Sequence, residues 1–306
     1  ERARTNLSTV GGMKILIAGA SGLIGTALQA ELEGHEVRTL VRREPSGAEE
    51  YRWRPEELRV PQEAIEWADG VVSLSGAPLG RLPWTRNYRR EIYHSRISAT
   101  RTLATAIAAA DDPPRVWVSG SAVGFYGDRP AEVLTEDSPP GEGFLSGVTQ
   151  RWEAATSAAD DVARVVHIRT GLVMAGKGAL APLLLATRLG AGSTIGTGQQ
   201  HWPWISLTDE ARAIAHLLTE SHLSGPVNLS GPDPVPSVEI TRALARQMRR
   251  PHLFRLPVWL LRAVLGEPAE EMLLPDQHVL PERLLADGFR FRHPTAEEAV
   301  AAALDG

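Results

Sequence analysis

Short apolar runs alternate with amphipathic helical stretches through the first half of the chain. Strand-like runs are expected at 14–18, 36–41, 69–74, 115–119 and 163–169, and helix-like patterns at 23–33, 63–68, 88–110 and 150–159. Runs rich in Val, Ile and Leu suit strands that are covered on both faces. Their alternation with helices predicts an α/β fold with a doubly wound parallel sheet.

The rhythm changes after Thr170, where glycine and proline become more frequent. A further strand is expected at 225–230, with helices at 238–249 and 296–304. With about 150 residues per domain as a guide, the 306 residues predict two domains. The larger is expected to take residues 13–170 plus about 207–230, and a smaller α/β domain residues 171–206 and 231–306. Residues 1–12 are polar and patternless, and we expect an expression remnant or a disordered lead there.

Composition narrows the function. With 32 Lys+Arg against 37 Asp+Glu, the net charge is −5, so a global basic field for nucleic acid is not expected. Cysteine is absent, which excludes disulfides, a cysteine nucleophile and thiolate metal sites. The histidines are scattered, so no metal is expected. No apolar run is long enough to cross a bilayer, and a cytoplasmic location is the default expectation.

The strongest motif is a glycine turn directly after the first predicted strand. Its spacing is Gly19-x-x-Gly22-x-x-Gly25, and it opens a helix. Glycines let the backbone approach a pyrophosphate, and a helix N-terminus offers free N–H groups. We therefore predict a dinucleotide site that includes Gly19, Ser21, Gly22, Leu23, Ile24 and Gly25.

The end of the second strand indicates which dinucleotide is bound. Arg42 and Arg43 stand there, where a carboxylate would bind the ribose hydroxyls of NAD. Guanidinium groups suit a 2′-phosphate, so NADP(H) is favoured over NAD(H). The alternative is that the two arginines are only a solvated strand end.

The end of the third predicted strand is made of small residues, Ser75, Gly76 and Ala77. Small residues there would let a dinucleotide lie across the edge of the sheet, so these three are predicted cofactor contacts. The alternative is a tight turn alone.

The ordered set of motifs resembles the extended short-chain dehydrogenase/reductases, and more narrowly their atypical YfcH-type, epimerase-like branch in the NAD-dependent epimerase/dehydratase superfamily. Besides the glycine turn and the arginine pair, the resemblance is carried by Ser95-Arg96-Ile97 with Thr100, Val118–Gly127, Trp152-Glu153, Arg169-Thr170-Gly171, Gly196-x-Gly198-x-Gln200, Trp204-Ile205 and Arg283-Leu284-Leu285. It covers about residues 13–304 and implies a Rossmann-like domain with a smaller C-terminal substrate-binding domain.

The resemblance also implies further cofactor contacts. The loop after the fifth predicted strand would pass beside the nicotinamide amide, and other matched positions would line the same cleft. These positions are Arg96, Ser119, Gly120, Thr170, Gly171, Leu172 and Val173.

One departure from the superfamily concerns the usual acid/base pair, a tyrosine followed four residues later by lysine. Neither lysine, Lys14 or Lys177, stands four residues after a tyrosine. The resemblance places Ser121 where a serine bonds the substrate oxygen. Tyr126, in the loop leaving that strand, is the best candidate for a substitute acid. The alternatives are a hydroxyl that only satisfies the strand end for Ser121, and a buried packing aromatic with a tethered hydroxyl for Tyr126.

A polar and aromatic cluster near the domain junction is the candidate substrate site, since clefts between domains commonly bind ligands. We predict substrate contacts from Gln200, His201 and Trp204. Histidine titrates near neutrality, although a histidine between aromatics is more often structural.

Three functions stay open from the sequence. The first is an NADP(H)-dependent, epimerase-like oxidoreductase acting on an unidentified small polar substrate without the Tyr-x-x-x-Lys pair. The second is an NADP(H)-sensing or scaffold protein without turnover, and the third is a repurposed fold with non-redox chemistry. Either a monomer or a homodimer is expected, with no nucleic-acid or membrane partner.

Overall fold

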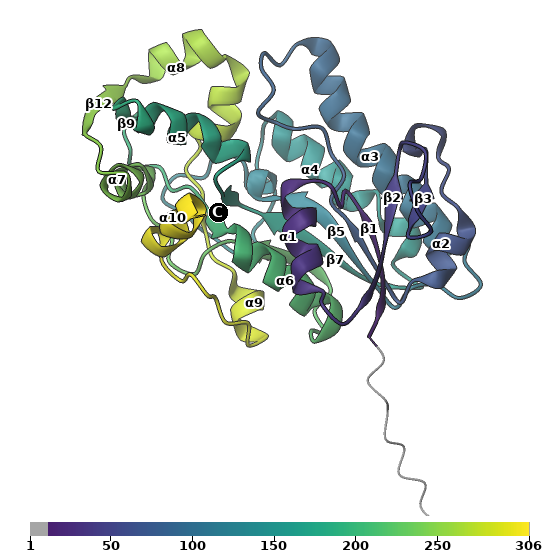
Figure 1. Ribbon diagram of the computed structural model, residues 1–306. Coiled ribbons are helices and arrows are strands. Elements are labelled where there is room, and N and C mark those ends of the chain that lie inside the picture. The colour runs from purple at the N-terminus through teal and green to yellow at the C-terminus, as the bar shows by residue number, and fades with distance from the viewer. Residues whose placement is uncertain (1–11, 306) are drawn as a thin grey trace, which may run out of the picture.

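A seven-stranded parallel sheet forms the centre of the computed structural model, which describes residues 12–305 (Figure 1). Its strands lie in the order β11-β7-β5-β4-β1-β2-β3. They span Lys14–Ala18 (β1), Glu36–Val41 (β2), Glu50–Arg52 (β3), Gly70–Ser73 (β4), Val116–Ala122 (β5), Arg164–Thr170 (β7) and Gly225–Leu229 (β11). The order runs outward from β1 in both directions, which confirms the predicted doubly wound α/β sheet. The expectation for residues 1–12 lies outside the described residues except for Gly12.

Helices cover both faces of the sheet because successive β1 side chains point to opposite sides. Ile15 and Ile17 are fully buried in one core with α1 (Leu23–Glu31) and α6 (Leu207–Thr219). Leu16 and Ala18 are equally buried on the other side, beneath α2 (Gln62–Trp67) and α3 (Arg86–Ala108). The helix α4 (Phe144–Ala154) packs against α3. The apolar strand runs are therefore explained by two cores that share one sheet.

Residues 171–206 and 231–305, called the C-terminal lobe here, lie for the most part beside the sheet (Figure 1), although Leu284 and Phe289 belong to the core of the main sheet. Its strands form parallel pairs, β8 with β10 and β9 with β12. The elements are β8 (Leu172–Met174), η4 (Gly178–Leu180), α5 (Ala181–Arg188), β9 (Gly192–Ile195), β10 (Trp204–Ser206), α7 (Ser237–Gln247), β12 (His252–Leu256), α8 (Val258–Leu265), η5 (Ala269–Leu273), β13 (His278–Val279), α9 (Glu282–Ala286) and α10 (Ala296–Asp305). Between the two segments of the lobe, the chain returns to the main sheet through α6 and β11.

Short elements complete the fold. They are η1 (Pro55–Glu57), η2 (Val123–Tyr126), β6 (Val133–Leu134), which pairs with β13, and η3 (Ser157–Ala159). Within residues 12–305, no helix combines the length and the apolar character that crossing a membrane requires.

Two of the differences from the sequence-based expectation concern the helix α4 and the strand β3. The helix predicted at 150–159 is α4, which begins six residues earlier by its printed bounds, at Phe144, and ends at Ala154. Glu271 accepts hydrogen bonds from the N–H groups of Phe144 and Leu145 at 2.8 and 2.9 Å. A carboxylate that is distant in sequence therefore caps the N-terminus of this helix. The strand β3 was not predicted, because three residues at a sheet edge carry too little pattern.

Candidate functional site

The glycine turn connects β1 to α1 in the form that the motif predicts. Gly19 has φ +92°, a conformation that favours glycine. A Cβ on Gly25 would lie 2.3 Å from the carbonyl oxygen of Gly19, so only glycine fits there. No side chain caps α1, and its first turn holds no acidic residue. The backbone N–H groups and the positive end of this helix are therefore open to an anion.

The two arginines at the end of β2 differ in their surroundings. Arg43 forms a bidentate pair with Glu50, with Nη1–Oε2 and Nη2–Oε1 distances of 2.7 and 2.5 Å. The hydrogen bond from Arg43 is the main cause that lowers the pKa of Glu50 to about 2. Arg42 is exposed and has no acidic partner among residues 12–305. Arg42 is therefore available to bind a 2′-phosphate, whereas the positive charge of Arg43 is already neutralised by Glu50.

Glu50 was missed by the sequence reasoning. It stands at the start of β3, next to Thr39 of β2, and nothing in its local sequence marks it as a partner of Arg43. The Glu50 carboxylate lies beside the predicted 2′-phosphate site and lowers the affinity expected of that site for a phosphate.

The loop after β4 lies against Arg96 of α3. The N–H of Ala77 donates to Ser95 Oγ at 2.9 Å, and a Cβ on Gly76 would come within 3.1 Å of the Arg96 guanidinium carbon. Arg96 lies over the Trp152 ring at 5.2 Å, and its Nη1 donates to the carbonyl oxygen of Ile92 at 3.0 Å. No carboxylate pairs with it in the described chain. Burial lowers the pKa of Arg96 to about 10, so it is still a cation at neutral pH.

The end of β5 packs closely against the ring of Trp152. A Cβ on Gly120 would lie 2.8 Å from Cζ2 of that ring, and Trp152 Nε1 donates to Thr100 Oγ1 at 2.9 Å. The hydroxyl of Ser119 lies 3.4 Å from that of Ser73 and is fully buried. The side chain of Ser119 is therefore used inside the sheet, and only its backbone is left for a ligand.

Ser121 belongs to a buried polar network that the sequence did not reveal. Its hydroxyl donates to Glu153 Oε1 at 2.6 Å. Glu153 also receives two bonds from Arg169, Nε to Oε1 at 2.8 Å and Nη2 to Oε2 at 2.9 Å. The resemblance singled out Glu153 and Arg169 only as matched positions. In the fold Glu153 and Arg169 form one ion pair, which holds the hydrogen-bond acceptor of Ser121 in place.

Tyr126 is enclosed rather than open to a substrate. Its side chain is 0 % exposed, and its hydroxyl donates to Asn228 Oδ1 at 2.6 Å while accepting from Arg169 Nη1 at 3.0 Å. Burial is the main cause that raises the pKa of Tyr126. The geometry favours the alternative interpretation, a packing aromatic with a tethered hydroxyl, over a direct proton donor.

The segment after β7 is held by a residue that sequence reasoning also missed. Thr170 Oγ1 donates to Glu210 Oε1 at 2.8 Å, and Glu210 is fully buried in α6. Burial, against the weaker effect of the Thr170 hydrogen bond, raises the pKa of Glu210 to about 8. Next to Thr170, a Cβ on Gly171 would lie 2.4 Å from the Pro203 carbonyl oxygen. In the sequence, Glu210 looks like an ordinary acidic residue in the first turn of a helix.

The predicted substrate residues have different environments. Gln200 is buried, and its Nε2 donates to the carbonyl oxygens of Ile195 and Leu273. Trp204 is buried and donates to the carbonyl oxygen of Asp233. Both side chains are thus committed to the lobe. His201 is only partly buried, and its Nδ1 lies 2.8 Å from Asp276 Oδ1. Of the three, His201 alone presents a ring edge that a substrate could reach.

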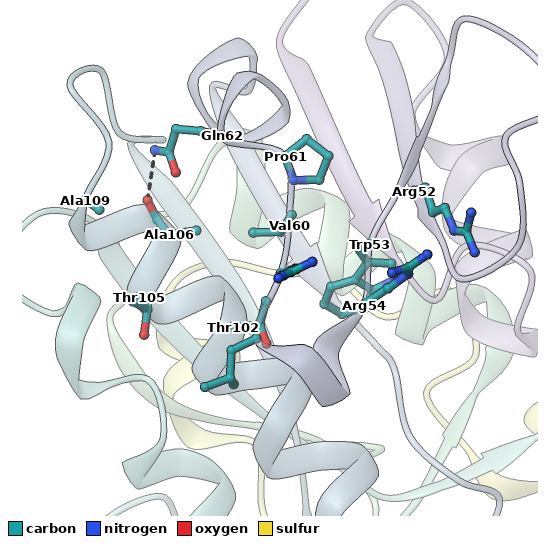
Figure 2. Close-up of a pocket in the computed structure, with 12 residues that line it drawn as sticks. Arg52, Trp53, Arg54, Val60, Pro61, Gln62, Thr102, Thr105, Ala106 and Ala109 are labelled. Carbon is teal, nitrogen blue, oxygen red and sulfur yellow. Dashed lines mark hydrogen bonds between the residues drawn. The ribbon is translucent and has the colours of Figure 1, made fainter.

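A cavity with a volume of about 550 Å³ lies elsewhere, between α2, η1 and the second half of α3. Figure 2 shows Gln62 donating to the Ala106 carbonyl oxygen at its rim, with Trp53 and Val60 among its apolar lining. Its arginines are paired, Arg54 and Arg59 with Glu57 and Arg52 with Glu44. None of its lining residues belongs to the predicted site, so we assign it no part in that site.

Comparisons with known proteins show the family to which the chain belongs. The model of the NAD dependent epimerase/dehydratase family matches residues 15–229, and a domain of unknown function, DUF1731, matches residues 256–303. The chain belongs to this epimerase/dehydratase family. An epimerase family protein of Mycobacterium leprae is 41% identical over 291 residues, with 94% of each chain covered. Human epimerase family protein SDR39U1 is 37% identical, with 92% of this chain and 96% of that protein covered.

Solved structures of the epimerase family have the same fold. The crystal structure of human SDR39U1 (isoform 2) with NADPH matches with a TM-score of 0.87 and 33% identity, covering 96% of this chain and 99% of that one. The nucleoside-diphosphate sugar epimerase of Corynebacterium glutamicum matches with a TM-score of 0.79 and 32% identity, covering 96% and 58%. The Rossmann-like fold and the family resemblance expected from the sequence are confirmed.

Proposed function

We propose that the chain is an NADP(H)-dependent, epimerase-like oxidoreductase that acts on a small polar substrate. The observation that carries the proposal is the open N-terminus of α1 behind a glycine turn, with the exposed Arg42 at the end of the neighbouring strand β2. These residues fit a dinucleotide, because its phosphates need N–H donors and positive charge. The NADPH in the structure of human SDR39U1 supports the choice of cofactor.

The cofactor contacts are proposed along the carboxyl ends of the strands. Gly19, Ser21, Gly22, Leu23, Ile24 and Gly25 would hold the pyrophosphate, Arg42 the 2′-phosphate, and Ser75, Gly76, Ala77 and Gly120 the ribose side. The segment Thr170–Val173 would border the nicotinamide. When bound, NADP(H) supplies hydride chemistry at C4 of that ring.

Ser121 is the proposed contact to the reacting oxygen of the substrate. Its hydroxyl can keep donating its proton to Glu153, so that the Ser121 oxygen accepts from a substrate hydroxyl. Alternatively it can turn to donate to a carbonyl oxygen, while Arg169 holds the Glu153 carboxylate in place. Tyr126 then acts as a positioning residue through Arg169, and His201 is the proposed outer contact for the substrate.

Two steps test this function. A fluorescence titration with NADPH and NADH is expected to give micromolar NADPH binding, with NADH at least about tenfold weaker, a difference of roughly 1.4 kcal/mol. A panel of carbonyl compounds is then screened for NADPH consumption, with Ser121→Ala as the inactive control. A protein that binds neither NADPH nor NADH would contradict the proposal.

A sensing or scaffold role without turnover is the second candidate. The enclosure of the Tyr126 hydroxyl supports it, because the tyrosine predicted as the substitute acid is then closed to a substrate. In that case NADPH binds and no member of the panel is consumed. Turnover that is lost in Ser121→Ala would exclude this candidate.

A further inference from the structure

Arg96 is a half-buried cation that has no carboxylate partner within residues 12–305. One face of its guanidinium lies over Trp152, and Gly76 borders it so closely that a Cβ would be 3.1–3.3 Å from its carbon and two terminal nitrogens. Only Nη1 donates to the protein, to the Ile92 carbonyl oxygen. Within residues 12–305, Arg96 Nε and Nη2 donate no hydrogen bond to the protein. Neither atom is among the fully buried side-chain atoms that lack a hydrogen-bond partner. Their N–H groups therefore remain open to solvent.

Arg96 is connected to the segment around Ser121 through Trp152. Trp152, which carries the guanidinium, also contacts Gly120, the residue before Ser121. Glu153, the next residue of α4, accepts the Ser121 hydroxyl. Trp152 therefore connects Arg96 of α3, which borders the loop after β4, with the end of β5 that carries Ser121.

Other charged groups nearby do not cancel this cation. Glu153 and Arg169 neutralise each other. Burial lowers the pKa of His167 and raises that of Glu210 to about 8, so both are mainly neutral at pH 7. Among these groups, Arg96 is the one whose charge is not balanced.

We propose that Arg96 makes this cleft select the reduced cofactor over the oxidised one. The inference rests on the proposed NADP(H) function. The two forms share every phosphate and ribose and differ by the positive charge on the oxidised nicotinamide ring. A fixed cation in a partly desolvated cleft opposes a second cation more strongly than it would in water. NADPH is consequently held and NADP⁺ released, which suits turnover in the reducing direction and equally suits a sensor of the ratio between the two forms.

A rival role for Arg96 gives a different pattern. If its guanidinium bound the pyrophosphate, the phosphates would neutralise it, and its loss would weaken both forms alike. The ligand 2′-phospho-ADP-ribose separates the two roles, because it keeps the pyrophosphate and lacks the nicotinamide ring.

The test measures dissociation constants of NADPH, NADP⁺ and 2′-phospho-ADP-ribose by calorimetry. The wild type is expected to bind NADPH at least about tenfold more tightly than NADP⁺. Arg96→Gln is expected to bring that ratio to within about twofold, with little change for 2′-phospho-ADP-ribose. Arg96→Lys keeps the charge and is expected to keep the preference. Arg101→Gln removes an exposed arginine from the same helix and is the matched control, with no change expected.

The outcomes separate the inference from the function on which it rests. Equal wild-type affinity for NADPH and NADP⁺ would overturn the inference without any variant, and leave the proposed function standing. An Arg96→Gln variant that loses affinity for all three ligands alike would also overturn it, in favour of a pyrophosphate contact. A wild type that binds neither dinucleotide would overturn the proposed function and the inference together.

Discussion

Ser121 and Glu153 are joined by a 2.6 Å hydrogen bond in which the serine hydroxyl donates to the carboxylate. The same carboxylate is the buried partner of Arg169, whose side chain is 4 % exposed. Removing one member of such a pair leaves a desolvated charge, whereas an exposed pair contributes little. Support of Ser121 and stability of the fold therefore depend on the same group.

Glu153→Gln is expected to destabilise the protein by about 3 kcal/mol, because Arg169 loses its carboxylate in a buried setting. Chemical denaturation measures the free energy of unfolding. Glu57→Gln is the control, since Glu57 pairs with Arg54 at the surface, and a change below about 1 kcal/mol is expected there. Equal effects of the two substitutions would show that the buried pair does not stabilise the fold more than the surface pair.

Tyr126→Phe is expected to cost about 1–3 kcal/mol of stability, because Asn228 and Arg169 each lose a buried hydrogen-bond partner. Affinity for NADPH should stay unchanged, since the hydroxyl is enclosed. Thermal unfolding and a fluorescence titration measure the two quantities. Tyr93→Phe is the control, since the Tyr93 hydroxyl makes no hydrogen bond with residues 12–305. A large loss of NADPH affinity in Tyr126→Phe would contradict the positioning role.

Arg42→Gln is expected to weaken NADPH binding by about tenfold while changing NADH binding little, because only NADPH carries the 2′-phosphate. Arg43→Gln should weaken it less, since Glu50 already matches that charge. Glu50→Gln removes the competing carboxylate and should tighten NADPH binding. Titration of the three variants with both dinucleotides decides the assignment. A Glu50→Gln variant that binds NADPH more weakly would mean that the pair, and not free Arg43, shapes the site.

Glu210 is expected to make the wild type less stable as the pH rises. Its pKa is about 8 in the folded protein, against 4.5 as the ordinary value. The folded state therefore holds a proton that the unfolded state has lost, and stability is fully present below pH 4.5 and is lost as the pH rises through 8. The slope is about 1.4 kcal/mol per pH unit between these values.

Glu210→Gln removes this titration while keeping the shape of the side chain. The difference in unfolding free energy between wild type and variant, measured by denaturation from pH 5 to 8, isolates Glu210 from His167, whose pKa burial lowers. The pH dependence should be shallower in the variant. Parallel curves would mean that Glu210 is charged in the folded protein.

The parts of the site that are local in sequence were predictable. The glycine turn follows its strand and opens its helix within seven residues, from Gly19 to Gly25, so the pattern contains all of its geometry. The doubly wound sheet was also predictable, because its strands are apolar on both faces. The cofactor residues predicted there stay predictions until a dinucleotide is titrated.

The supporting contacts were not predictable, because their partners are distant in sequence. Glu153 stands 32 residues from Ser121, Asn228 stands 102 residues from Tyr126, and Glu271 stands 127 residues from Phe144. Each partner is an ordinary polar residue in its own segment. Only the folded chain shows that Tyr126 is enclosed and that Arg43 is already paired.

The path of the chain through the C-terminal lobe affects how this protein could be re-engineered. The chain leaves the main sheet after β7, returns through α6 and β11, and leaves again. His201 belongs to the first segment of the lobe, residues 171–206, and its partner Asp276 belongs to the second, residues 231–305. A chimera that exchanged one contiguous stretch with a relative would split this pair between two parents. Transplanting the His201–Asp276 pair, our proposed outer contact for the substrate, therefore requires both segments to be moved together.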